Sequence, residues 1–70
     1  TDLRASADWL LQAAEAGNVT AMAEIGRVLA YGLGVAVDRD AALVWLDQAA
    51  RVGDAAAADL ARLLRLDAGQ

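Results

Sequence analysis

The sequence contains no cysteine, no histidine and no lysine. Without cysteine it cannot form a disulfide, and without cysteine or histidine it cannot build a zinc site from the usual nitrogen and sulfur ligands. The side chains that most often act as general bases or activated nucleophiles are also missing. Ser6 is the only serine and has no histidine to activate it, and nothing supports Thr1 as an N-terminal nucleophile. We therefore expect no metal, no cofactor and no enzymatic activity.

Positive charge is scarce as well, because the only basic residues are six arginines and the net charge is −4. Nucleic acid is not an expected partner, since phosphate backbones are bound by clustered cations. No apolar run approaches the ~20 residues of a membrane span, and no basic segment precedes an apolar stretch as it does in a signal peptide. We expect no membrane association, and the composition assigns no compartment.

Aromatic residues make up only 4% of the chain, whereas 59% of it is hydrophobic. Alanine supplies much of that hydrophobic share. It has the highest helix propensity and lets helices approach closely, so the composition predicts closely packed helices. Seventy residues make at most one small domain with a limited core.

One stretch occurs twice at a constant offset of 36 residues, from Trp9 to Trp45 and from Gly17 to Gly53. W-L-L-Q-A-A-E-A-G-N at 9–18 returns as W-L-D-Q-A-A-R-V-G-D at 45–54. Self-similarity at such a period is typical of stacked helical repeats. We predict an all-α fold: an α-α superhelix, that is, a short right-handed solenoid of antiparallel helical hairpins with four helices.

Apolar spacing predicts helices over residues 3–16, 19–31, 39–52 and 55–66. Gly17 and Gly53 are expected to end the first and third helices in the left-handed conformation. Links of about two residues then force antiparallel neighbours. The expected N-caps are the short polar residues before each helix: Asp2, Asn18, Asp38 and Asp54.

Two predictions concern packing. Gly26 lies in the middle of a predicted helix, which usually marks a close approach, and we expect Trp45 or Leu46 near it; a hinge is the alternative. Trp9 and Trp45 are expected to occupy equivalent, largely buried sites between helices.

The segment 32–37 is the one predicted loop, and we expect Leu33 and Val35 to tuck under the helices. Its G-x-G is not interpreted as a phosphate-binding loop, because no strand precedes it and no helix opens at the glycines. Asp38-Arg39-Asp40 fits a helix start better than a cation site. Asp47 and Arg51, four residues apart, are expected to form a surface ion pair.

At these residues the chain resembles the Sel-one-like repeat family, helical-hairpin repeats related to the tetratricopeptide class. The resemblance combines G-x-G-V, a capping aspartate and W-x3-A-A-x2-G. With the repeat boundaries of that family, residues 18–53 form one complete repeat, flanked by half-repeats 1–17 and 54–70 of a single domain. The predicted helix 55–66 aligns with the predicted helix 19–31 at an offset of 35, where Leu60 matches Ile25, so the orientation of this last helix is left open. The matching residues are Ala21, Ile25, Gly26, Gly32, Gly34, Val35, Asp38, Ala42, Trp45, Ala49, Ala50 and Gly53.

The resemblance implies a scaffold that binds a partner peptide or domain on its concave helical face. The alternative is a structural segment of a longer repeat array, or a self-association module without its own ligand. We also expect open apolar ends that a second copy or a partner covers. These ends comprise Leu3, Ala7 and Leu11 on one side and Leu63 and Leu66 on the other.

The concave face is expected to lie on the second and fourth helices. Because three of the six arginines are predicted on it, an acidic segment or a terminal carboxylate is the expected ligand. The alternative is that Arg27 and Arg62 merely pair with Glu24 and Asp59 on their own helices. The candidate partner-binding residues are Thr20, Ala23, Arg27, Tyr31, Ala58, Arg62 and Arg65.

Overall fold

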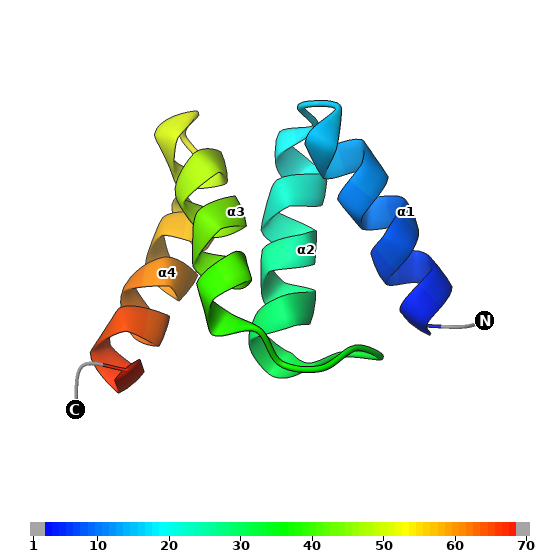
Figure 1. Ribbon diagram of the computed structural model, residues 1–70. Coiled ribbons are helices and arrows are strands. Elements are labelled where there is room, and N and C mark those ends of the chain that lie inside the picture. Colours follow the sequence, from blue (N-terminus) through cyan, green and yellow to red (C-terminus); the bar gives the residue numbers. More distant parts are fainter. Residues whose placement is uncertain (1–2, 69–70) are drawn as a thin grey trace.

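The computed structural model describes residues 3–68, and this part of the chain contains four helices and no strand (Figure 1). The helices are α1 (Leu3–Glu15), α2 (Val19–Tyr31), α3 (Arg39–Arg51) and α4 (Ala55–Ala68). Successive helices run in opposite directions, so the chain forms the hairpins α1–α2 and α3–α4. The prediction of an all-α protein with four helices is confirmed for the described residues, and every helix end lies within two residues of its predicted position.

Side-chain caps fix where three of the helices begin. In each, an amide or carboxylate oxygen accepts a hydrogen bond from the backbone N–H three residues later, at 2.9–3.0 Å. The bond satisfies one of the donors that the first turn of a helix leaves without a partner. These caps are Asn18, Asp38 and Asp54, as predicted; Asp2 and Thr1 lie outside the described residues.

Glycines provide the turns. Gly17 and Gly53 have φ angles of 97° and 99°, in the left-handed region that a side chain would strain, as predicted. In the loop between α2 and α3, the Asp38 N–H donates to the Leu29 carbonyl at 2.9 Å and ties the loop to the end of α2. Val35 is half-buried, but Leu33 is 42% exposed, so the prediction that both tuck under the helices holds only for Val35.

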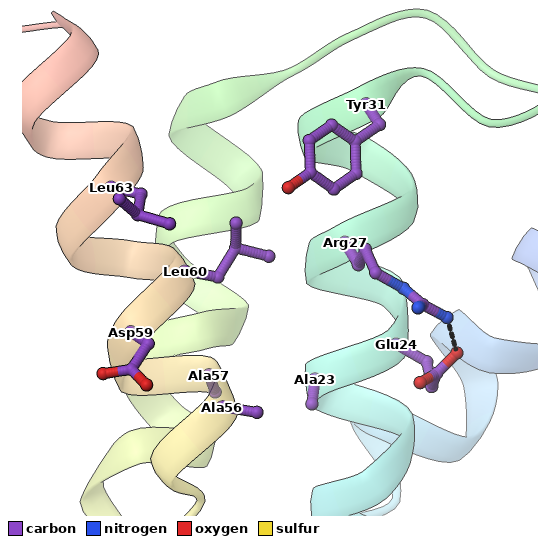
Figure 2. A pocket seen from close by; sticks show the side chains of 9 residues that line it. All are labelled: Ala23, Glu24, Arg27, Tyr31, Ala56, Ala57, Asp59, Leu60 and Leu63. Carbon is purple, nitrogen blue, oxygen red and sulfur yellow. Dashed lines mark hydrogen bonds and ion pairs between the residues drawn. The ribbon is translucent and has the colours of Figure 1, made fainter.

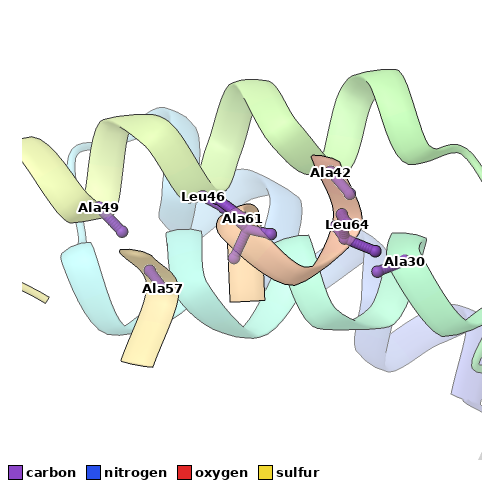
Figure 3. Packing of buried hydrophobic residues seen from close by; sticks show 7 residues of the cluster. All are labelled: Ala30, Ala42, Leu46, Ala49, Ala57, Ala61 and Leu64. Carbon is purple, nitrogen blue, oxygen red and sulfur yellow. The ribbon is translucent and has the colours of Figure 1, made fainter. Parts of the chain in front are cut away.

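The core consists of two small clusters built largely from alanine. The first joins α1 to α2, and the second surrounds Leu46 of α3, between α2 and α4 (Figure 3). Leu46 is 0% exposed and is the largest fully buried side chain of the described residues. The first cluster contains Ala7, Ala14, Ala21, Ile25 and Val28; the second contains Leu46 with Ala30, Ala42, Ala49, Ala57, Ala61 and Leu64.

Gly26 explains how α3 comes so close to α2. A Cβ atom at this position would lie 2.6 Å from Cγ and Cδ2 of Leu46, well inside carbon–carbon contact distance. The predicted approach of Leu46 to Gly26 is therefore confirmed, and the glycine serves packing within a continuous helix.

Three buried positions of α2 recur in α4 at the 36-residue offset. Ala57, Ala61 and Leu64 are buried, as are Ala21, Ile25 and Val28 at the equivalent positions of α2. The caps Asn18 and Asp54 have the same spacing. The 35-residue alignment of the last helix is therefore wrong, since the cap sets where α4 begins and its buried face follows from that start.

The predicted equivalence of the two tryptophans is also wrong. Trp45 is half-buried and packs against the cluster between α1 and α2, whereas Trp9 is 71% exposed. The reason is their place in the row of helices. Trp45 can reach the other hairpin, but α1 packs mainly against α2, and no helix of the described residues covers its far side.

Candidate functional site

A hollow of the described surface lies between α2 and α4 and has a volume of about 370 Å³. We call it the α2–α4 groove (Figure 2). This volume lies at the lower end of the range of ~300–1,000 Å³ typical of ligand pockets. The groove is lined by Ala23, Glu24, Arg27 and Tyr31 of α2 and by Ala56, Ala57, Asp59, Leu60 and Leu63 of α4.

Small side chains create the space and large apolar ones shape it. Ala23 of α2 and Ala56 of α4 leave the gap between the two helices open, and Leu60 projects from α4 towards α2 (Figure 2). The ring of Tyr31 stands at one end, with its hydroxyl group directed towards α4. Tyr31 and Leu63 are 57% and 58% exposed, so both side chains are accessible to a ligand beside the hollow.

The charged groups of the lining are already paired within their own helices. Arg27 Nη2 donates a hydrogen bond to Glu24 Oε2 at 2.6 Å, and in Figure 2 this pair points away from the gap. Arg62 donates to Asp59 Oδ1 at 3.4 Å. Both are exposed pairs three residues apart, a kind that contributes little to stability. The groove is therefore apolar in its middle, and its lining carries two carboxylates and one guanidinium.

The structure brings together only part of the predicted binding set. Ala23, Arg27 and Tyr31 line the groove, while Thr20 lies exposed on α2 outside it. The three predicted residues of α4 are not among the lining residues: Ala58, Arg62 and Arg65.

Arg65 turns towards α3, where it donates a hydrogen bond to Asp47. That bond and the nearby negative charge raise the pKa of the Arg65 guanidinium above its ordinary value. Asp47 was predicted to pair with Arg51 one turn along α3, but it pairs with Arg65 instead, because α4 lies beside α3. The three arginines thus do not gather on one face.

The 35-residue alignment does not predict the α4 side of the groove, because it places α4 one residue out of register. At the 36-residue offset, Ala23 corresponds to Asp59, Glu24 to Leu60 and Arg27 to Leu63, and all six residues line the groove. The equal spacing of the caps Asn18 and Asp54 was visible in the sequence and could have set this register.

Other kinds of site find little support in the described part of the chain. It holds no group of three or more side chains that could bind a metal ion. It also leaves no buried side-chain nitrogen or oxygen without a hydrogen-bond partner. Among the same residues, no helix has the length and apolar character needed to cross a membrane.

No protein-family model, curated protein or solved structure matches the chain significantly. The likeness to the Sel-one-like repeats therefore rests on the residues of this sequence alone.

Proposed function

We propose that this protein is an interaction module of the Sel-one-like type, and that its α2–α4 groove binds a short segment of a partner protein. The observation that carries the proposal is the groove itself. It is a 370 Å³ hollow with Leu60 in its middle and with Tyr31 and Leu63 largely exposed beside it. Large exposed apolar side chains around a concavity are characteristic of interaction sites.

The arrangement of the hairpins supports this interpretation. In our proposal they are consecutive units of a short right-handed solenoid, related by the 36-residue offset. Equivalent positions of α2 and α4 then face the same side and line one continuous surface. Repeat solenoids use such extended concave surfaces for binding.

The lining chemistry favours a ligand with an apolar side chain at its centre. Leu60, Leu63 and the alanines offer contact area, and the Tyr31 hydroxyl offers a hydrogen bond at one end. Arg27 is already paired with Glu24, and Arg62 is paired with Asp59, so neither arginine offers an unpaired charge to an acidic ligand. We therefore propose an apolar segment with uncharged flanks, in place of the acidic segment expected from the sequence.

A peptide selection against the immobilised chain tests this function. Peptides from a random displayed library should be enriched for an apolar anchor, and the enriched peptides should then be titrated against two matched variants. Ala56→Arg fills the groove from an exposed position of α4, whereas Ala58→Arg places the same side chain on the same helix outside the groove. We expect Ala56→Arg to lose binding and Ala58→Arg to retain it.

Two results would contradict the proposal. Equal affinity of the selected peptides for both variants, with helical circular dichroism unchanged, would place the binding surface outside the groove. Enrichment of acidic peptides whose binding depends on Arg62 and Arg65 would instead support the cationic face expected from the sequence.

A structural role is the second candidate, and one observation favours it. Trp9 is 71% exposed on the far side of α1. In this alternative the chain is one segment of a row of stacked hairpins, and the groove has no ligand of its own.

A further inference from the structure

The α2–α4 groove offers a bound chain few hydrogen-bonding partners. Its lining residues belong to two helices, whose interior backbone N–H and C=O groups already bond to each other along the helix. Among the described residues that line it, Tyr31 carries the only uncharged polar side chain. Glu24 and Arg27 are paired with each other, and Asp59 is paired with Arg62. A ligand therefore has to satisfy most of its backbone hydrogen bonds by itself where it enters the groove.

A helical ligand meets this requirement, whereas an extended one does not. In an α-helix every interior N–H donates to a carbonyl of the same helix, but an extended segment relies on a neighbouring strand, on polar side chains or on water. The described residues contain no strand whose edge could pair with it. An extended segment would leave the backbone groups that face Leu60 and the alanines without partners, and such groups are costly once water is excluded. The lining thus favours a ligand in helical conformation.

The groove has room for two apolar side chains. Its volume of about 370 Å³ is more than twice the ~150 Å³ of a dry cavity that holds a benzene molecule. Leu60 divides this space, since in Figure 2 it lies between Ala23 and Ala56 on one side and Tyr31 on the other. The α4 side of the lining extends from Ala56 to Leu63, about two turns of helix. Two side chains four positions apart on a ligand helix, about 6 Å along its axis, fit on the two sides of Leu60 within this length.

We propose that the α2–α4 groove binds an amphipathic α-helix of a partner protein. Two apolar residues four positions apart on that helix straddle Leu60, one beside Ala23 and Ala56 and the other beside Tyr31 and Leu63. The charge of the groove matches such a ligand. Each side of the groove holds one ion pair within its own helix, so the apolar floor meets the apolar stripe of the ligand and the two sides meet uncharged polar residues beside that stripe. This inference rests on the proposed function and adds the conformation and the residue pattern of the ligand.

Two displayed peptide libraries test the pattern. Both consist of alanine and glutamine over about 16 residues, long enough to form a helix in water, and contain two positions that vary among the apolar residues. These positions are four apart in one library and two apart in the other, and both libraries are selected against the immobilised chain. We expect enrichment from the first library. Its best peptide should bind roughly 10–100-fold more tightly than the isomer with the same residues two apart, because a helix presents only one of those two to the groove.

Proline substitutions in the best peptide test its bound conformation. Proline between the two apolar positions breaks a helix and should weaken binding roughly 100-fold. Proline at the first helical position is tolerated in a helix and is the matched control, which should bind as the parent peptide does. The place of binding is checked on the protein, where Ala56→Arg should lose the peptide and Ala58→Arg should retain it.

The results separate this inference from the proposed function. Tighter binding of peptides with apolar residues two apart, or full tolerance of the central proline, overturns the helical ligand even where Ala56→Arg abolishes binding and the groove remains the site. Equal affinity for Ala56→Arg and Ala58→Arg, or no enriched peptide from either library, overturns both. If Ala56→Arg lacks the helical circular dichroism of the wild type, Leu63→Ala at an exposed position takes its place: weaker binding supports the proposal, and unchanged affinity overturns it.

Discussion

Replacing Gly26 with alanine tests the packing on which the arrangement of the two hairpins depends. By intrinsic propensity alone, glycine to alanine inside a helix should stabilise the protein by about 0.5–1 kcal/mol. The added Cβ atom would, however, stand 2.6 Å from two carbons of Leu46. Apolar carbons prefer a separation of about 3.5–4.0 Å, so the two helices must separate by roughly 1 Å or Leu46 must move.

Leu46 has little room to move, because it is 0% exposed and surrounded by alanines of α3 and α4. Inserting a methyl group into such a packed site costs about 1–3 kcal/mol. This cost exceeds the propensity gain, and we expect a net loss of about 1–2 kcal/mol in the free energy of unfolding. For a domain of this size, the melting temperature should fall by roughly 5–15 °C.

Thermal and urea unfolding followed by circular dichroism measure this change. The matched control is the same Gly26→Ala substitution in a Leu46→Ala background. The Leu46→Ala protein and the Gly26→Ala/Leu46→Ala double variant are compared at one fixed concentration of a stabilising osmolyte that keeps both folded. There the collision is absent, so alanine should stabilise by its helix propensity, and the effect of the substitution should change sign. A higher melting temperature for Gly26→Ala in the wild-type background would refute the reasoning, because it would show that the helices are not held in contact at this glycine.

Three further predictions follow from burial and pairing. Trp9→Ala should change the free energy of unfolding by no more than about 0.5 kcal/mol, whereas Trp45→Ala should lower it by about 2–3 kcal/mol. Equal losses of stability in urea unfolding would contradict the different burial of the two rings. Asp54→Ala removes the cap of α4 and should cost about 1 kcal/mol, with Asp54→Asn as the control that retains the capping oxygen. Arg65→Gln should lower the melting temperature at low ionic strength and have no effect in high salt, because its partner Asp47 lies on the surface; a salt-independent loss would indicate a packing role.

The sequence alone determined the local structure of this protein. Helix ends, caps and left-handed turns depend on residues within a few positions of one another, so Asn18, Asp54 and Gly17 could be interpreted without knowing the fold. The close approach at Gly26 was also predictable, since glycine is unfavourable inside a helix unless a neighbouring helix needs the space of its missing side chain. The all-helical character follows from these local signals and from the apolar spacing.

Only the tertiary structure decided which equivalent residues are buried and which charges meet. Trp9 and Trp45 have similar local sequences, but burial depends on whether another hairpin lies beside the helix, and one does so only for Trp45. Asp47 had an acceptable partner on its own helix, yet Arg65 of the neighbouring helix lies within reach and pairs with it. The groove likewise depends on how α2 and α4 face each other, which is set by the packing of both helices against α3.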